Sequence, residues 1–234
     1  MVLMPTRTQR AERRADALSK ERIVEAAIEI LDGGGETALT FRALAARLAT
    51  GSGAIYWHVA NKNELLAAAT DDVIARVTTG VAGGADPAEA IRAIAVGIFD
   101  AIDAHPWVGT QLSSEPWQSA ILPIFESIGR QLQALGVPER AQFDSASALV
   151  NYILGLAGQY AAAARLLTPE TDRSAFLEAV AARWVQRDPG KYPFVRQVAP
   201  QLRDHDDRQQ FLAGIELILA GIATVRLRAG AEQP

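Results

Sequence analysis

The chain has 234 residues, of which 49% are hydrophobic and 21% are charged, so it is long enough to form one large or two small globular domains. It has no cysteine, which excludes disulfides and thiol catalysis, and its three histidines leave few metal ligands. The formal net charge of −4 gives no general attraction to nucleic acid, so any such contact must be local.

The N-terminal stretch is the basic end of the chain. Residues 1–62 carry nine Lys and Arg against seven Asp and Glu, a balance of +2. Four arginines lie in its first part: Arg7, Arg10, Arg13 and Arg14. This distribution is expected if only this end meets phosphates, although a solvated tail fits the composition equally well.

Neither a secretory signal nor a membrane span is expected. The first 20 residues contain arginines but no apolar run after them, so we expect a cytoplasmic protein. Residues 145–164, SASALVNYILGLAGQYAAAA, contain no charge over a length that could cross a bilayer. Asn151, Gln159 and the many alanines favour a buried helix of a soluble protein instead.

No segment alternates with a period of two, so we expect only helices. Ser19 is a good N-cap for a first helix, and the three glycines of DGGGE, residues 32–36, are expected to end it. Thr40 is expected to cap a second helix that ends near Ala49. A third, very short helix is expected over about 52–58, and a fourth from Asn61 or Asn63.

Residues 78–87, TTGVAGGADP, form the clearest linker, because three glycines and a proline fall there. Asp86 followed by Pro87 suits an N-cap and first helical position. Further helices are predicted over 87–104, 116–135, 139–166, 173–187 and 207–228. The HP pair at 105–106 and four other proline-containing segments separate them.

The second and third helices have the spacing of a helix-turn-helix. A helix of about seven residues is not stable alone, so Ile55 and Val59 are expected to hold it by packing inward. Ser52 and Ala54 then face outward, where their side chains suit contacts with base edges. The glycines have no side chain, so the backbone of the first turn can approach DNA closely. Tyr56, Trp57, His58 and Lys62 offer donors and charge to the sugar-phosphate backbone.

The segment LTFRALAARLATGSGAIYWHVANKNELL, residues 39–66, resembles the DNA-binding segment of the tetracycline-repressor (TetR) family of bacterial regulators. The match departs from the family at Ala49, where glycine is usual, and at Gly51-Ser52, where Ser-Pro or a similar pair is usual. The resemblance implies contacts with a double-stranded DNA operator for nine residues: Thr40, Arg42, Ser52, Gly53, Ala54, Tyr56, Trp57, His58 and Lys62.

Two later segments place apolar residues at alternating spacings of four and three. They are Leu149, Ile153, Leu156, Tyr160 and Ala163, and Phe211, Ile215, Ile218, Ile222 and Val225. This spacing suits long helices that pack at a shallow angle, either inside one chain or as a four-helix bundle between two chains. Residues 192–222 also look like the end of a TetR C-terminal domain, which favours a homodimer interface on 145–165 and 207–228.

The family's C-terminal domain encloses a small-molecule pocket, and apolar walls with a few polar groups suit one here. The candidate lining residues are Phe99, His105, Trp107, Gln111, Trp117, Phe125, Asn151, Tyr152, Gln159 and Tyr160, each of which is as well explained as plain core. Tetracycline-binding members hold magnesium through histidines. A gapless count places Thr78 and Leu112 at those positions, so we expect neither this metal nor a cofactor.

The predicted fold class is all-α, with an N-terminal three-helix helix-turn-helix domain and a larger α-helical domain for ligand binding and dimerisation. The predicted boundaries are a flexible basic arm at 1–18, the helix-turn-helix domain at 19–78 and the larger domain at 79–234. The expected function is a sequence-specific transcriptional regulator, most often a repressor in this family, released from a palindromic operator by an effector of unknown identity. An all-α enzyme, for which we find no catalytic motif, and a ligandless DNA-binding protein with a filled core are the alternatives.

Overall fold

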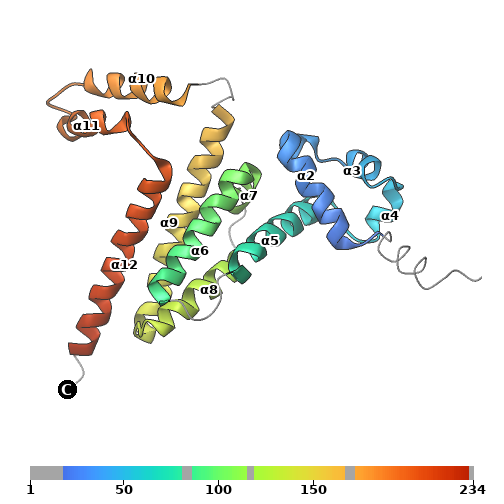
Figure 1. Ribbon diagram of the computed structural model, residues 1–234, viewed down its shortest axis with the longest axis horizontal. Coiled ribbons are helices and arrows are strands. Elements are labelled where there is room, and N and C mark those ends of the chain that lie inside the picture. Colours follow the sequence, from blue (N-terminus) through green and yellow to red (C-terminus); the bar gives the residue numbers. More distant parts are fainter. Residues whose placement is uncertain (1–17, 81–85, 115–118, 167–171, 232–234) are drawn as a thin grey trace, which may run out of the picture. The chain divides into compact units, whose positions relative to one another are not determined.

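The computed structural model describes residues 18–80, 86–114, 119–166 and 172–231, without the side chains of 114, 157, 160–166 and 231. Within these ranges the secondary structure is helical and contains no strand, as the sequence predicts (Figure 1). Contacts divide the chain into two compact units, Met1–Val73 and Ile74–Pro234. The division falls inside one continuous helix, α5 (Lys62–Gly80).

The first unit contains α2 (Lys20–Ala38), α3 (Phe41–Arg47), α4 (Ser52–Tyr56) and the first part of α5. Both predicted caps are confirmed: Ser19 accepts a hydrogen bond from the Arg22 amide at 3.3 Å, and Thr40 accepts one from Ala43 at 3.1 Å. These side chains satisfy amide groups that have no partner inside the helix. The core comes from the apolar faces of all four helices, and Ile23, Leu44, Ile55 and Leu65 are almost completely buried.

The end of α2 differs from the prediction. Helical hydrogen bonding continues through the first two glycines of DGGGE, and the backbone leaves the helix only at Gly35, with φ of 66° and ψ of −170°. The helix resumes briefly to Ala38. Only glycine adopts this conformation at little cost, which explains why one of the three glycines interrupts the helix.

The second unit is built on α6 (Pro87–Ala104), α7 (Pro106–Ser114), α8 (Ile121–Ala134) and α9 (Glu139–Leu166). In Figure 1, α6, α7 and α9 run beside one another, and α7 and α8 both pack on α9. Buried residues at helical spacing form the core, including Ile94 and Ile98 of α6 and Ile124 and Ile128 of α8. The bounds of α6 and α9 are those predicted.

Helix α7 was not predicted, because the HP pair at 105–106 was interpreted only as a break between helices. Pro106 is the first residue of α7, a position where a proline loses no hydrogen bond. The prediction also missed α11 (Pro193–Val198), which again begins with proline and leads into the 3-10 helix η1 (Ala199–Leu202). Helix α10 (Arg173–Val185) packs on both α11 and η1.

The last helix, α12 (Asp207–Ala231), is fastened to α6 and α9. Arg208 binds Asp100 of α6 with two hydrogen bonds, and Arg92 of α6 binds both carboxylate oxygens of Glu216. The Tyr152 hydroxyl of α9 donates to backbone carbonyls of α12. A side chain at Gly214 would collide with this tyrosine, so glycine permits the close approach of the two helices.

The predicted four-three stripes pack mainly inside the chain's own second unit. Phe211, Ile215 and Ile222 of α12 and Leu149 and Ile153 of α9 are buried in the unit's own core. They are therefore not available to a second chain, and any interface on these helices must use their other faces.

Within the described residues, one helix, Asp207–Gly230, is long and apolar enough to cross a membrane, with a mean hydropathy of 1.6. Its ion pairs with Asp100 and Arg92 attach it to a charged partner helix. The core contacts of α12 account for part of its apolar composition.

Candidate nucleic-acid interface and ligand cavity

The turn between α3 and α4 is closed by backbone hydrogen bonds. The Thr50 amide donates to the Ala45 carbonyl at 3.0 Å, and the Ala49 amide donates to the Ala46 carbonyl at 3.3 Å. This is the Schellman pattern, whose pivotal residue lies in the left-handed region and is usually glycine. Here Ala49 occupies it with φ of 50°, so the departure from the family pattern carries a conformational cost.

Helix α4 is held by one face only. Ile55 is completely buried and Val59 is 1% exposed, which confirms that they are the inward pair. Ser52 and Gly53 are exposed on the opposite side, and Ala54 is half-buried. No heavy atom lies within 4 Å of where a side chain on Gly53 would begin, so the first turn of α4 is open to solvent.

Two large aromatic side chains extend this exposed surface. Tyr56 stacks on Phe41 of α3, with ring centroids 4.4 Å apart and planes 6° from parallel, yet it remains 54% exposed. Trp57 is 90% exposed, so it is not a core residue. Because an exposed indole gains little from the fold, this position favours contact with a partner.

The side chain of Lys62 already has partners. Its ammonium donates to the Glu36 carbonyl at 2.6 Å and lies 3.8 Å from the Glu36 carboxylate. The start of α5 is fixed separately, because Asn61 accepts from the Glu64 amide and Glu64 accepts from the Ala60 amide. This is a reciprocal capping arrangement. A phosphate at Lys62 would therefore have to compete with Glu36.

The remaining predicted contacts lie on the same unit. Thr40 and Arg42 are exposed at the start of α3, and His58 is half-buried after α4. The hydroxyl of Thr40 is engaged as the cap of α3, although it still has a hydrogen to donate. The predicted basic arm, with Arg7, Arg10, Arg13 and Arg14, lies outside the described residues.

A cavity of about 720 Å³ lies between α7, α8 and α9. Its lining comprises Leu112, Ser113, Ile121, Phe125, Phe143, Ser147, Val150, Asn151, Leu154, Gly155 and Gly158. None of these side chains is charged. The rings of Phe125 and Phe143 lie 5.9 Å apart, and the polar groups are two hydroxyls and one amide. Apolar walls with a few polar groups are typical of small-molecule sites.

The structure separates the residues predicted to line one pocket. Phe125 and Asn151 line this cavity. Phe99 and Tyr152 instead pack on Phe211 of α12, with ring centroids 5.1 and 5.8 Å away. Of the others, His105 and Trp107 contact each other around the start of α7, Gln111 is half-buried on α7, and Gln159 is exposed on α9. Trp117 and the side chain of Tyr160 lie outside the described residues.

Sequence reasoning did not select several residues of the cavity wall, including Ser113, Phe143 and Ser147. Ser113 donates to the Gly109 carbonyl at 2.7 Å, which leaves its oxygen able to accept a bond from a ligand. Phe143 is 65% exposed at the edge of the cavity. Its position five residues into a predicted helix, away from other aromatics in sequence, gave no signal of this role.

A helix-turn-helix unit joined to a larger all-helical unit defines a class of DNA-binding regulators. The model of the tetR family of bacterial regulatory proteins matches residues 23–69, and that of the tetracyclin repressor-like C-terminal domain matches residues 82–226. The chain therefore belongs to the TetR family of DNA-binding transcriptional regulators.

Relatives support this assignment. An HTH-type transcriptional regulator from Saccharopolyspora erythraea is 30% identical over 150 residues, which is 64% of each chain. The class D tetracycline repressor protein from Escherichia coli is 26% identical over 222 residues, covering 87% of this chain and 88% of the relative.

Solved structures show the same fold. The transcriptional regulator SCO7222, a TetR from Streptomyces coelicolor, has a TM-score of 0.80 and 54% identity, covering 90% of this chain and all of that one. The Streptomyces coelicolor protein ActR in complex with actinorhodin has a TM-score of 0.73 and 23% identity, covering 88% of this chain and 95% of ActR.

Proposed function

We propose that this protein is a dimeric cytoplasmic repressor that binds a palindromic operator through α3 and α4 and leaves it when a small molecule binds in the α7–α8–α9 cavity. The observation that carries the DNA-binding part is the one-sided packing of α4. Ile55 fixes the helix from within, while the opposite face presents a low first turn followed by Trp57. Such a helix can enter a major groove without losing its own support.

The nine predicted DNA contacts divide by chemistry. Ser52, Gly53 and Ala54 lie on the first turn of α4, where a short side chain lets the backbone approach base edges. The hydroxyls, rings and charges of Thr40, Tyr56, Trp57, His58 and Lys62 serve the sugar-phosphate backbone, and Arg42 serves either a base edge or a phosphate. These backbone contacts set the register of the protein on DNA and carry no sequence information.

The proposed homodimer uses the exposed faces of α9 and α12. Leu217 is 75% exposed and Leu227 is 70% exposed, and the exposed small residues Gly221 and Thr224 lie between them at spacings of three and four. On α9, the small residue Ala148 is also exposed. Apolar and small residues repeated along two neighbouring helices suit a four-helix bundle around a two-fold axis.

The effector proposed for the α7–α8–α9 cavity is an uncharged, largely aromatic molecule. The cavity offers two phenylalanine rings and the polar groups of Ser113, Ser147 and Asn151, and a charged ligand would find no countercharge among the described residues of its lining. The complex of ActR with actinorhodin shows a ligand bound to a protein of this fold. A 720 Å³ cavity also weakens the alternative of a ligandless protein with a filled core.

Release follows if the effector binds better to a form in which the two α4 helices no longer match successive major grooves. Such a ligand shifts the population away from the DNA-bound form. The required groove spacing is about 34 Å, one helical turn of DNA.

The test begins with selection of bound duplexes from a random library by the purified protein. We expect a palindromic consensus with half-sites about one helical turn apart, and a complex that contains two protein chains. The matched variants are Leu217→Glu, which places two carboxylates at the proposed interface, and Leu122→Glu, which changes a 72% exposed leucine on α8. Only Leu217→Glu should yield monomers by sedimentation, and enrichment of no sequence would refute the proposed function.

A further inference from the structure

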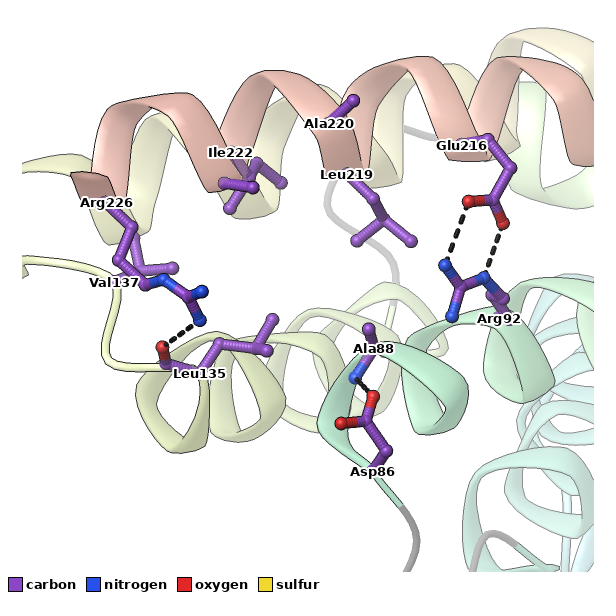
Figure 2. A pocket seen from close by; sticks show the side chains of 11 residues that line it. Asp86, Ala88, Arg92, Leu135, Val137, Glu216, Leu219, Ala220, Ile222 and Arg226 are labelled. Carbon is purple, nitrogen blue, oxygen red and sulfur yellow. Dashed lines mark hydrogen bonds and ion pairs between the residues drawn. The ribbon is translucent and has the colours of Figure 1, made fainter. Parts of the chain in front are cut away.

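A second cavity, of about 390 Å³, lies between α12, the N-terminal end of α6 and the turn from α8 to α9 (Figure 2). Among the described residues, it shares no lining residue with the α7–α8–α9 cavity. Its apolar walls come from Leu135 and Val137 on one side and from Leu219 and Ile222 of α12 on the other. Its size is within the range of small-molecule sites.

Three of the four ionisable side chains that line this cavity are paired within the fold. Glu216 accepts from Arg92 at both carboxylate oxygens, and these hydrogen bonds hold the pKa of Glu216 below its usual range. Asp86 caps α6 and accepts from the amides of Ala88 and Glu89 at 2.9 and 3.2 Å. The carboxylates of Glu216 and Asp86 are therefore already engaged and do little to neutralise the remaining positive side chain, Arg226.

Arg226 is the fourth ionisable side chain that lines the cavity. Its guanidinium donates to the Leu135 carbonyl at 2.9 Å, which is a neutral acceptor, and no acidic side chain within the described residues pairs with it (Figure 2). An arginine has five N–H donors in a rigid plane, so most of them remain available. The hydrogen bond to Leu135 holds the guanidinium against the cavity and fixes its direction.

We propose that this cavity binds a small organic monoanion with an apolar body. Its carboxylate or sulfonate pairs with Arg226, and the body packs on Leu135, Val137, Leu219 and Ile222. A charge-assisted bond to a planar guanidinium supplies direction, while the burial of the apolar body supplies area. This chemistry differs from that of the α7–α8–α9 cavity, where none of the lining residues that the structure describes is charged. The site does not depend on DNA binding.

The test uses two fluorescent probes with the same ring system. One is 8-anilinonaphthalene-1-sulfonate, and the other is N-phenyl-1-naphthylamine, which lacks the sulfonate. Titrations of the full chain compare wild type with Arg226→Gln and with Arg228→Gln, which removes an exposed arginine of α12 that does not line the cavity. Ala223→Trp provides an independent variant, because it fills the cavity from α12 and leaves Arg226 in place.

We expect Arg226→Gln to weaken binding of the sulfonate probe about 10- to 100-fold, as loss of a hydrogen bond to a charged group does. Binding of the amine probe should not change, which shows that the variant remains folded. Arg228→Gln should bind both probes as wild type does, and Ala223→Trp, which fills the space for the shared ring system, should weaken binding of both probes. Equal affinity of wild type and Arg226→Gln for the sulfonate, or equal losses in both arginine variants, would overturn the proposal.

Discussion

Replacement of Trp57 by alanine tests whether this residue contributes to DNA binding or to the stability of the fold. The indole is 90% exposed, so its removal takes few contacts from the folded unit. We expect the free energy of unfolding to change by no more than about 0.5 kcal/mol, the usual range for a surface substitution. If Trp57 donates one hydrogen bond to the DNA backbone, each subunit loses about 0.5–1.5 kcal/mol. A dimer then loses about 1–3 kcal/mol, which is about a 5- to 150-fold weaker complex.

The assay is fluorescence anisotropy of a selected duplex and of a random duplex, paired with urea denaturation of the same variants. Trp57→Phe keeps an aromatic ring but removes the N–H donor, so it should behave like alanine if hydrogen bonding dominates and closer to wild type if stacking does. Phe194→Ala removes a 69% exposed aromatic of α11 and should change neither measurement. Undiminished DNA affinity of Trp57→Ala, or a loss of stability of several kcal/mol, would refute the reasoning.

Four variants, two of them followed over a pH series, test other parts of the structure. Ala49→Gly should stabilise the first unit by up to about 1 kcal/mol in urea denaturation, because glycine adopts the left-handed conformation without strain. Leu217→Glu should give monomers in sedimentation, and it should weaken binding to a full palindrome more than to a half-site. Tyr152→Phe should lower stability by about 1 kcal/mol and remove an alkaline loss of stability. That loss is expected because burial raises the tyrosine pKa, so the stabilisation holds below pH 10 and declines above it. The lowered pKa of Glu216, caused mainly by its hydrogen bonds from Arg92, predicts the opposite sign. Its contribution should be present above the pKa of the unfolded chain and disappear as acid protonates the folded carboxylate, and Glu216→Gln should flatten this acid limb.

Helix starts could be predicted from the sequence because capping is a local property. Ser19, Thr40 and Asp86 accept hydrogen bonds from amides two or three residues ahead, and no distant part of the chain is needed for that. Prolines were harder, because the same residue ends one helix and begins another. Pro106 was taken as a break, whereas it is the first residue of α7.

The buried face of α12 could not be predicted, because two stripes on that helix have helical spacing. The more regular apolar stripe begins at Phe211 and lies in the core of its own unit. The exposed stripe through Leu217 consists mostly of small residues and gives a weak pattern. Only the packing of α12 on α6 and α9 decides which side faces inward.

Only Phe125 and Asn151 of the described cavity wall were predicted, and the reason is again that the sequence pattern fits two roles. Aromatic residues in a helical domain can fill a core or border a space, and composition does not distinguish these roles. Tyr152 and Phe99 fill space around Phe211, whereas Phe125 borders the cavity. Small polar residues such as Ser113 carry no signal of cavity lining in a single sequence.

The most direct test of the central proposal compares Ala54→Glu and Lys62→Ala on a selected duplex and a random duplex over a series of salt concentrations. Glutamate at Ala54 would lie against base edges, so we expect loss of preference for the selected duplex, with a cost of about 1–3 kcal/mol for each disrupted base contact. Loss of Lys62 should weaken binding to both duplexes alike. It should reduce the slope of log affinity against log salt by about 2 for a dimer, or by less if Glu36 retains the ammonium. Retained sequence preference in Ala54→Glu, together with altered preference in Lys62→Ala, would contradict the proposed DNA-binding face of α4.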